Sequence, residues 1–359
     1  MIKINGSYLE GGGQIVRTAL ALSTLTGKPF KITNIRKSRS KPGLKHQHLT
    51  AIKVLKELCN ASTKGDSLES SYLEYIPRKL KFHNLNIDIG TAGSITLLLQ
   101  ALLPVLIFSD KKITVKITGG TDTKYSQPID YFTNVFLPHL NKYGDFETSL
   151  EKRGYYPKGN GRFILKIKPK YSIYSFKNFS ELLKFIKGDV APINLTKQGK
   201  LLVVKGISHA SKELMKANVA DRQARTAKYL LSKLNVPVRI NVHYVDSLSV
   251  GSGITLWAIF STTNEMNFNN PIILGADSLG KKGKKSEIIA KEVSERLIKQ
   301  IKSKAAVDKY LADQLLLYMA LFSGSIKTSE ITDHCKTNIY TIKKFLNVKF
   351  KTKENIITC

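Results

Sequence analysis

The sequence predicts a mixed α/β fold of the α+β kind, in which a large domain of repeated α/β units carries a smaller inserted α/β domain. Apolar residues alternate between the two-residue period of strands and the 3.6-residue period of helices along most of the 359 residues. The same succession of strands and helices recurs through the first 180 residues, and the stretch that follows has elements of its own. The length also exceeds one ordinary core, which favours two compact parts.

Three successive cycles of strand and helix patterns make up the N-terminal body. The first has a strand at 1–6, a helix at 11–27 that stops at Gly27, and a strand at 29–35. The second has helices at 44–61 and 93–109 and strands within 72–90 and 111–120. The third has a helix at 128–144 and a hairpin at 153–169. The recurrence predicts a structurally repeated α/β body.

The next stretch has the pattern of an insertion. We expect its strands at 201–210, 238–245, 254–262 and 272–280, and its helices at 217–235 and 284–303. The chain then returns to the first body with an apolar helix at 310–324. We therefore expect a large catalytic domain of residues 1–180 and 306–359, and an inserted smaller domain of residues 181–305.

The charge balance indicates a polyanionic partner. Lys and Arg number 57 and Asp and Glu number 27, which gives a formal net charge of +30. RNA, DNA or a nucleotide fits this charge, an acidic membrane surface fits it less well, and a general abundance of lysine is the alternative.

The cysteines and the apolar runs argue against several classes of protein. Cys59, Cys335 and Cys359 have no CxxC spacing, so a zinc site is not supported, although pairing of Cys335 with Cys359 stays open. The N-terminus has no apolar leader pattern, and no uncharged apolar run reaches the roughly 18 residues of a membrane span. We expect a cytoplasmic protein without a membrane partner.

Two N-terminal stretches have the composition of anion sites. In "EGGGQIVR", three glycines precede a helix whose N–H groups attract anions; Glu10 is a candidate metal ligand and Arg17 a candidate phosphate ligand. In "IRKSRSKPGLKHQH", at 35–48, Pro42 and Gly43 predict a loop with five basic residues and no acid, among them Arg36 and Arg39. A tight turn without a ligand and a solvated run of charge are the respective alternatives.

Further polar positions are candidates for nucleotide contacts. Gln47 lies at the start of a helix and could bind a sugar or phosphate oxygen, and Pro128 beside Tyr131 could form a platform for a base. In "YLADQLLL", Tyr310 and Gln314 share a helix face. Ordinary packing and solvated polar groups are the alternatives for these positions.

His334 lies in the polar segment "DHCKTNI". A lone histidine is more often solvated than catalytic. No serine motif supports a hydrolase triad, and no HxxxH spacing supports a metal site. If His334 takes part in chemistry, the sequence favours direct attack on phosphorus.

Seven segments, taken in order, resemble the RNA 3'-terminal phosphate cyclase family: "EGGGQIVRTALALS", "RKSRSKPGLKHQHLTA", "GTAGSITLLLQALLP", "GGTDTKYSQPIDY", "RGYYPKGNG", "KAAVDKYLADQLLL" and "HCKTNI". The resemblance implies a large domain of three repeated βαβαββ-like units with an inserted smaller domain. It also implies conversion of an RNA 3'-phosphate end to a 2',3'-cyclic phosphate, with ATP and a divalent metal, Mg²⁺ or Mn²⁺.

The resemblance assigns roles to the candidate residues. His334 would form a covalent histidine–AMP, and Glu10 would contact the metal. The triphosphate and RNA phosphate sites would be lined by Arg17, Arg36, Arg39 and Gln47, and Pro128 and Tyr310 would enclose the adenine. Asp313 and Gln314 would contact the nucleoside. A homodimer is also compatible with the resemblance.

The sequence departs from the family pattern at two positions, and two other functions are alternatives to an RNA 3'-terminal phosphate cyclase. Asn160 stands where the family usually has glycine, and Tyr318 where proline is common. A catalytically inactive cyclase-like RNA-binding factor for ribosome assembly is the first alternative, but that subfamily lacks the histidine. An enolpyruvyl transferase is the second, and it would not explain the charge.

Overall fold

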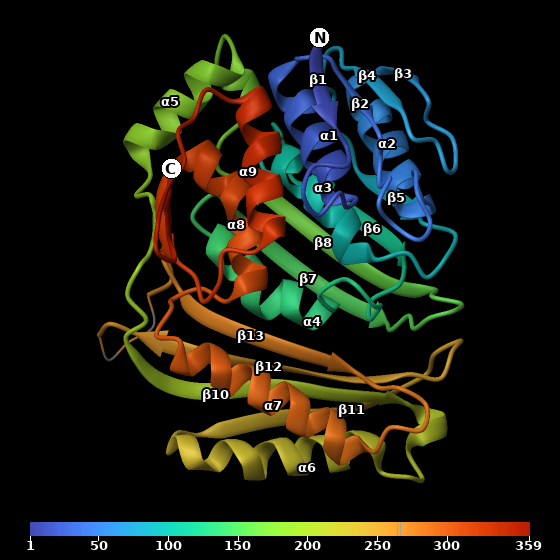
Figure 1. Cartoon of the computed structure of the whole chain (residues 1–359), viewed down its shortest axis with the longest axis vertical. Coiled ribbons are helices and arrows are strands. Elements are labelled where there is room, and N and C mark those ends of the chain that lie inside the picture. The colour runs from blue at the N-terminus through green and yellow to red at the C-terminus, as the bar shows by residue number, and fades with distance from the viewer. Residues whose placement is uncertain (264, 266) are drawn as a thin grey trace.

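A computed structural model describes residues 1–263, 265 and 267–359. Its described strands form four four-stranded sheets. The fold is the predicted mixed α/β fold, and Figure 1 shows one group of strands and helices below a larger body. We call residues 200–302 the inserted unit and the rest of the chain the main body.

The main body consists of three βαβαββ repeats. In each repeat the first strand pairs in parallel with the second, the second pairs antiparallel with the fourth, and the fourth pairs antiparallel with the third. Sheet orders are therefore equivalent: β1-β2-β4-β3, β5-β6-β8-β7 and β9-β14-β16-β15 among the described residues. The expected repeated units are confirmed.

The bounds of the repeats follow from these pairings. The first comprises β1 (Ile2–Asn5), α1 (Gln14–Thr26), β2 (Phe30–Thr33), α2 (His46–Cys59), β3 (Ser62–Lys64) and β4 (Leu73–Ile76). The second comprises β5 (Leu85–Asp88), α3 (Ile95–Leu106), β6 (Ile113–Gly119), α4 (Ile129–Tyr131) with the turns η1 (Phe132–Phe136) and η2 (Leu137–Leu140), β7 (Gly144–Lys152) and β8 (Gly161–Pro169). The third comprises β9 (Ile193–Leu195), α8 (Lys309–Phe322), β14 (Gly324–Lys327), α9 (Asp333–Phe345), β15 (Lys351–Lys353) and β16 (Ile356–Thr358).

The expected division into cycles was wrong in detail. The helix at 44–61 belongs to the first repeat and the helical stretch at 128–144 to the second. The hairpin expected at 153–169 instead pairs β7 (Gly144–Lys152) with β8 (Gly161–Pro169), so residues 153–160 form its loop. Hydrophobic periodicity gives the order of elements along the chain, but sheet membership depends on long-range pairing that a local pattern does not contain.

The helices of the three repeats pack against one another, and α1 contacts α2, α3 and α9. Helix α3 is the most apolar, and ten of its twelve residues are buried. Each fully buried leucine of this helix contributes about 1.5–3 kcal/mol to folding. This packing brings the N-terminal ends of helices from different repeats into one region.

The inserted unit interrupts the third repeat between β9 and α8. It comprises β10 (Lys200–Ser211), η4 (Lys212–Leu214), α6 (Val219–Leu231), η5 (Ser232–Leu234), β11 (Val238–Val245), β12 (Ser252–Ser261), β13 (Ile272–Leu279) and α7 (Ser286–Lys302), which confirms the expected strands and helices. Between β8 and β9 lie η3 (Ile173–Ser175) and α5 (Phe179–Asp189). The expected domain limits at 181 and 305 stay predictions, and strand pairing assigns β9 to a sheet of the main body.

One face of the inserted sheet is covered by α6 and α7, and the other faces the main body. Helix α4 contacts both β12 and β13, and Figure 1 shows β13 as the strand nearest α4. All ten residues of β12 are buried because both of its faces are covered. The two parts are therefore packed through side chains as well as joined by the chain.

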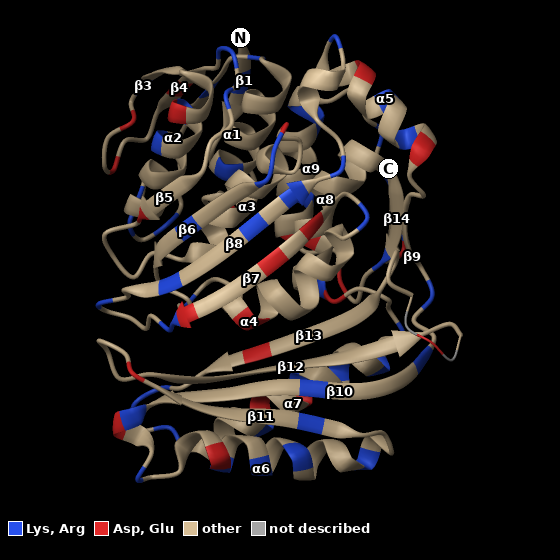
Figure 2. Ribbon diagram, turned by 180° about the vertical axis from the view of Figure 1, so that it is seen from behind, with Lys and Arg blue, Asp and Glu red and all other residues tan. Residues whose placement is uncertain are grey.

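The surface charge is distributed. Figure 2 shows Lys and Arg on β8, β10, β11 and α6, in both the main body and the inserted unit.

Cys59, Cys335 and Cys359 are free, which answers the open question of a Cys335–Cys359 disulfide. In the described part of the chain, none of the helices combines the length and apolar character needed to cross a membrane.

Gly275 tests the packing between the two parts. A Cβ at this position of β13 would overlap the buried Tyr131 ring, so we expect Gly275→Ala to lower the free energy of unfolding by about 1–3 kcal/mol. Gly188→Ala is the matched control, since nothing lies within 4 Å of its Cβ position in α5. The control should be neutral or stabilising by up to about 1 kcal/mol. Urea unfolding of both variants measures the difference, and equal effects would contradict the packing argument.

Candidate active site

The glycine-rich turn leads directly into α1. Gly13 is the N-cap of this helix, and a Cβ on Gly12 would overlap the carboxylate of Glu10. A Cβ on Gly13 would overlap the imidazole of His48. The glycines therefore let Glu10 and His48 approach this turn closely, and Gly13 leaves the N–H groups at the start of α1 without a capping side chain.

His334 lies in the first turn of α9, close to the start of α1. Thr332 caps α9 by accepting a hydrogen bond from the Cys335 backbone N–H. The His334 side chain is 52% exposed, and its Nδ1 lies 3.2 Å from Gln14 Oε1. Tertiary packing thus joins residues that are 320 positions apart in the sequence.

A polar network fixes the orientation of Gln14. Its Nε2 donates to the Asp313 carboxylate, so its Oε1 faces the histidine. Asn338 Nδ2 donates to the same aspartate, at 2.9 Å to the carbonyl oxygen and 3.3 Å to Oδ1, and Thr18 donates to Asn338 at 2.8 Å. Because Gln14 Oε1 can only accept, this arrangement assigns the hydrogen of neutral His334 to Nδ1 and leaves a lone pair on Nε2.

Glu10 and Arg39 lie beside the same imidazole. Arg39 pairs with Glu10 Oε1, and Glu10 Oε2 lies 3.6 Å from His334 Nδ1. Burial lowers the pKa of His334, Asp313 opposes this shift, and Arg17 and Arg39 lower the pKa further. Residues near the N-terminus of a helix also experience its positive end. His334 is therefore neutral at pH 7, the form in which imidazole is a nucleophile.

Arg17 is the cation closest to a small cavity at this site. The cavity has a volume of about 30 Å³, and its walls include Gln14, Arg17, Gln100, Asp313 and Gln314. Burial lowers the pKa of Arg17 to about 10, although Asp313 raises it, so the guanidinium is charged at neutral pH. Among the described residues, its buried Nε has no hydrogen-bond partner. The cavity has room for water rather than for a whole nucleotide.

The basic loop between β2 and α2 has the predicted non-helical conformation, but its two arginines differ. Arg39 reaches the site through Glu10. Arg36 has a φ of 53°, and its Nη1 donates to the carbonyl oxygens of Lys41 and Gly43 at 2.7 and 3.0 Å. Burial lowers the pKa of Arg36. Arg36 therefore stabilises the loop, and its proposed contact with RNA stays a prediction.

Gln47 and His48 connect α2 to neighbouring helix starts. Gln47 Oε1 accepts from the backbone N–H of Ser94, the N-cap of α3, at 3.3 Å. His48 Nδ1 accepts from the Lys45 N–H at 3.0 Å, and burial with the positive charges of Arg17, Arg36 and Lys45 lowers the pKa of His48 to about 3. Both side chains thus help to position helix N-termini around the site.

The predicted base platform is only partly as expected. Tyr131 is fully buried and donates to both carboxylate oxygens of Asp308 at 2.8 and 2.9 Å, so it follows the alternative of ordinary packing and is not a base platform. Asp308 is the N-cap of α8. This contact joins the segment of Pro128 to the segment of Tyr310, whose ring is 39% exposed. Enclosure of an adenine by Pro128 and Tyr310 stays a prediction.

Several site residues were not singled out from the sequence. Gln14 and Asn338 orient the histidine and its aspartate, and Gln100 lines the cavity. Gln100 offered a signal, since it is a polar residue within an otherwise apolar stretch of α3. Gln14 and Asn338 offered none, because their importance depends on a contact between the first and third repeats.

Fold and site together define an α/β protein in which an oriented histidine lies beside basic side chains and the N-terminus of a helix. A family model described as RNA 3'-terminal phosphate cyclase matches residues 8–352. The chain is 44% identical over 351 residues to RNA 3'-terminal phosphate cyclase of Pyrococcus abyssi, covering 98% of this chain and 94% of the relative. It is 43% identical over 357 residues to the protein of that name from Pyrococcus furiosus, covering 99% and 96%. The chain belongs to the RNA 3'-terminal phosphate cyclase family.

The two departures from the family pattern have local explanations. Asn160 has a φ of 56°, and asparagine tolerates this left-handed conformation better than most residues other than glycine. Tyr318 is buried in α8 and packs its ring against Phe136 and Phe322. Neither residue alters the contacts of His334.

The electrostatics of His334 can be measured directly. We expect its pKa to lie below 6.5, Arg39→Ala to raise it and Asp313→Asn to lower it, because a nearby cation disfavours the imidazolium and a nearby carboxylate favours it. A pH titration of ¹⁵N-labelled imidazole signals by NMR, with His334 assigned from the spectrum of His334→Asn, gives these values. Arg222→Ala is the control, since Figure 1 shows α6 at the opposite end of the molecule from α9. Shifts in the reverse directions would contradict the described geometry.

Proposed function

We propose that this protein is an ATP-dependent RNA 3'-terminal phosphate cyclase that acts through a covalent histidine–AMP intermediate. The observation that carries the proposal is the orientation of His334: Gln14 accepts from Nδ1, so the lone pair of Nε2 is available beside the anion-attracting starts of α1 and α9. The names of the relatives agree with this activity.

Three substitutions at phosphorus make up the proposed cycle. His334 Nε2 attacks the α-phosphorus of ATP, a P–N bond forms, and pyrophosphate leaves. An oxygen of the RNA 3'-phosphate then attacks the same phosphorus, which releases the histidine and gives RNA(3')pp(5')A. The adjacent 2'-hydroxyl attacks the terminal RNA phosphorus, loses its proton and displaces AMP, leaving the 2',3'-cyclic phosphate. Proximity of the 2'-hydroxyl is supplied by the substrate itself.

The charges at the site suit this chemistry. Arg17 has an unpartnered Nε among the described residues, and it lies beside the network that orients His334. Arginine and helix N–H groups together stabilise the charge that accumulates on phosphoryl oxygens during transfer. We infer that Arg17, Arg39 and Gln47 contact the phosphates, and that Tyr310, Asp313 and Gln314 lie along the nucleoside.

Glu10 would hold the divalent metal. Its Oε2 is buried and has no hydrogen-bond partner in the described part of the chain, and it lies next to His334. Mg²⁺ is commonly bound by one or two carboxylates together with substrate phosphates, so this donor fits such an ion. When bound, the metal would neutralise charge on the triphosphate. Arg39 holds the other Glu10 oxygen and keeps the carboxylate aimed at the site.

The proposed partner is RNA with a 3'-phosphate end, in agreement with the net charge of +30. A homodimer and a cytoplasmic location are further predictions. The inactive RNA-binding factor is the weaker reading, because the chain has His334 and an intact network that orients it.

Covalent labelling tests the nucleophile. With ATP labelled at the α-phosphate and a divalent metal, wild type should gain label that is lost in acid and survives alkali, as expected of a P–N bond. His334→Ala should lose the label, and His83→Ala, at an exposed histidine paired with Glu57, should retain it. Absence of label on wild type that binds ATP would favour the RNA-binding factor.

Removal of the contact to Nδ1 tests the orientation of His334. Gln14→Met should slow labelling at saturating ATP by about 10²-fold, because the imidazole loses its fixed orientation and tautomer. Gln300→Met, at a glutamine in α7 of the inserted unit, is the matched control and should label at the wild-type rate. Rapid-quench kinetics give both rates, and an unchanged rate in Gln14→Met would remove Gln14 from the mechanism.

A further inference from the structure

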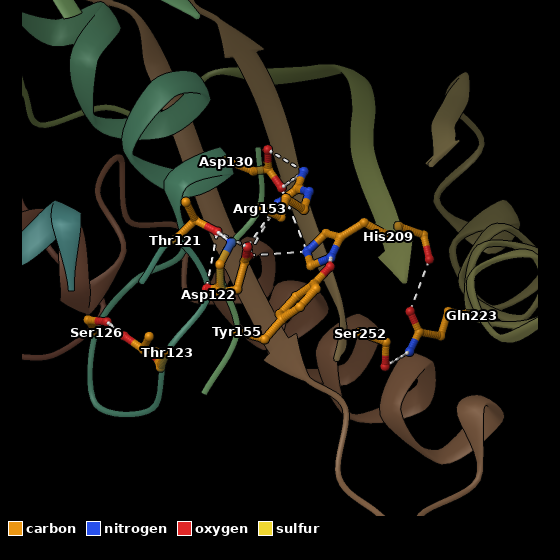
Figure 3. A network of polar contacts seen from close by, with 12 residues as sticks. Thr121, Asp122, Thr123, Ser126, Asp130, Arg153, Tyr155, His209, Gln223 and Ser252 are labelled. Carbon is orange, nitrogen blue, oxygen red and sulfur yellow. Dashed lines mark hydrogen bonds and ion pairs between the residues drawn. The ribbon is translucent and has the colours of Figure 1, made fainter. Parts of the chain in front are cut away.

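A buried ionic cluster lies where the main body meets the inserted unit (Figure 3). Arg153, which follows β7, donates to Asp122 at 3.2 and 3.3 Å and to Asp130 at 2.8 and 3.0 Å. These three side chains are at most 6% exposed. Burial would raise the pKa of Asp122, but His209 and Arg153 hold it well below its usual range. Asp122 is therefore ionised, and Arg153 joins it to Asp130 through hydrogen bonds to both carboxylates.

His209 is the contribution of the inserted unit to this cluster. It lies in β10, is fully buried, and places Nε2 3.2 Å from Asp122 Oδ1. Its Nδ1 lies 2.8 Å from the hydroxyl of Tyr155, and burial raises the pKa of Tyr155, so the hydroxyl is protonated and donates. Nδ1 is then the acceptor and the hydrogen of neutral His209 is on Nε2, which lies within ion-pair distance of Asp122 Oδ1 although its N–H is not aligned for a hydrogen bond.

The cluster has the donor types of a metal site, since Asp122, Asp130 and His209 offer ligand atoms within 4.8 Å of one another. The Arg153 guanidinium already lies against both carboxylates and balances one of their two charges. A metal ion would have to displace a buried arginine and leave it unpaired, which is strongly unfavourable. The arrangement fits a structural contact between the two parts better than a metal centre.

A second contact joins the inserted unit to the start of α8. The backbone N–H of Gly275 in β13 donates to Asp308 Oδ2 at 2.9 Å. Asp308 also accepts from the N–H groups of Tyr310 and Leu311 and from the Tyr131 hydroxyl, and it is fully buried. The inserted unit thus completes the hydrogen bonds of the aspartate that begins α8.

Both contacts lead to segments that carry predicted nucleotide contacts. Asp122 belongs to the loop between β6 and α4 that ends at Pro128, and Asp130 lies in α4, two residues after Pro128. Asp308 begins the helix of Tyr310 and Gln314. Each segment is therefore fixed at one point by a group of the inserted unit, although the segments themselves belong to the main body.

We propose that the inserted unit orders the nucleotide-binding surface of the main body, with His209 as a positioning residue that acts through Asp122 on the Pro128 loop. The Gly275 N–H plays the equivalent part for the start of α8. This inference rests on the proposed function, since it assigns the Pro128 and Tyr310 segments to nucleotide binding. In this proposal the inserted unit affects nucleotide binding without contacting the reacting atoms.

Nucleotide affinity and the rate of histidine labelling, measured separately, test the proposal. We expect His209→Ala to raise the Kd of α,β-methylene-ATP, measured by calorimetry, about tenfold, a usual size for coupling between sites. Labelling by ATP at saturation should stay within about threefold of wild type, because the contacts of His334 are untouched. His209→Gln, which can place an amide N–H toward Asp122, should recover most of the affinity.

Ser208→Ala is the matched control. Ser208 is the adjacent, equally buried residue of β10, but its hydroxyl donates to Ala220 and Gln223 within the inserted unit. The control should bind the analogue like wild type even if its thermal midpoint falls. An unchanged Kd in His209→Ala, or equal weakening in Ser208→Ala, would overturn the inference. Wild type that neither binds the analogue nor becomes labelled would instead overturn the proposed function.

Discussion

The hydrogen bond between His334 and Gln14 is the contact on which the rest of the site depends. It joins the start of α9 in the third repeat to the start of α1 in the first, and it fixes which imidazole nitrogen is free. Asp313 holds the other end of Gln14 and is itself held by Asn338. The half-exposed His334 thus has one orientation, because the hydrogen bonds among Gln14, Asp313 and Asn338 fix the group that contacts it.

The repeated architecture explains how these groups meet. Each repeat places two helices on its sheet, and packing of helices from different repeats brings the starts of α1 and α9, with the adjoining start of α2, into one region. Helix starts expose N–H groups and a positive end, so their convergence gives this region a positive backbone potential that favours anions. Arg17 and Arg39 add charge to that region, and Glu10 balances part of it beside the histidine.

The inserted unit also contacts segments that lie near the site. It enters the third repeat between β9 and α8, and two of its polar contacts with the main body lie at the start of α8 and in the loop before α4. Buried charges such as those of Asp122 and Arg153 tolerate little displacement, because a charge that loses its partner in the interior is costly. The insertion therefore restrains the main body at the segments nearest the predicted nucleotide.

The sequence by itself determined most strands and helices up to about residue 324, the insertion, the glycine-rich turn, the basic loop and the candidate histidine, because periodicity, breakers and charge are local properties. Only the tertiary structure decided which elements share a sheet, that Arg36 folds back on its own loop, and that Tyr131 is core rather than platform. It also decided the roles of Gln14, Asn338 and His209. These depend on contacts between residues hundreds or tens of positions apart, and a local pattern contains no information about which distant partner satisfies a buried polar group.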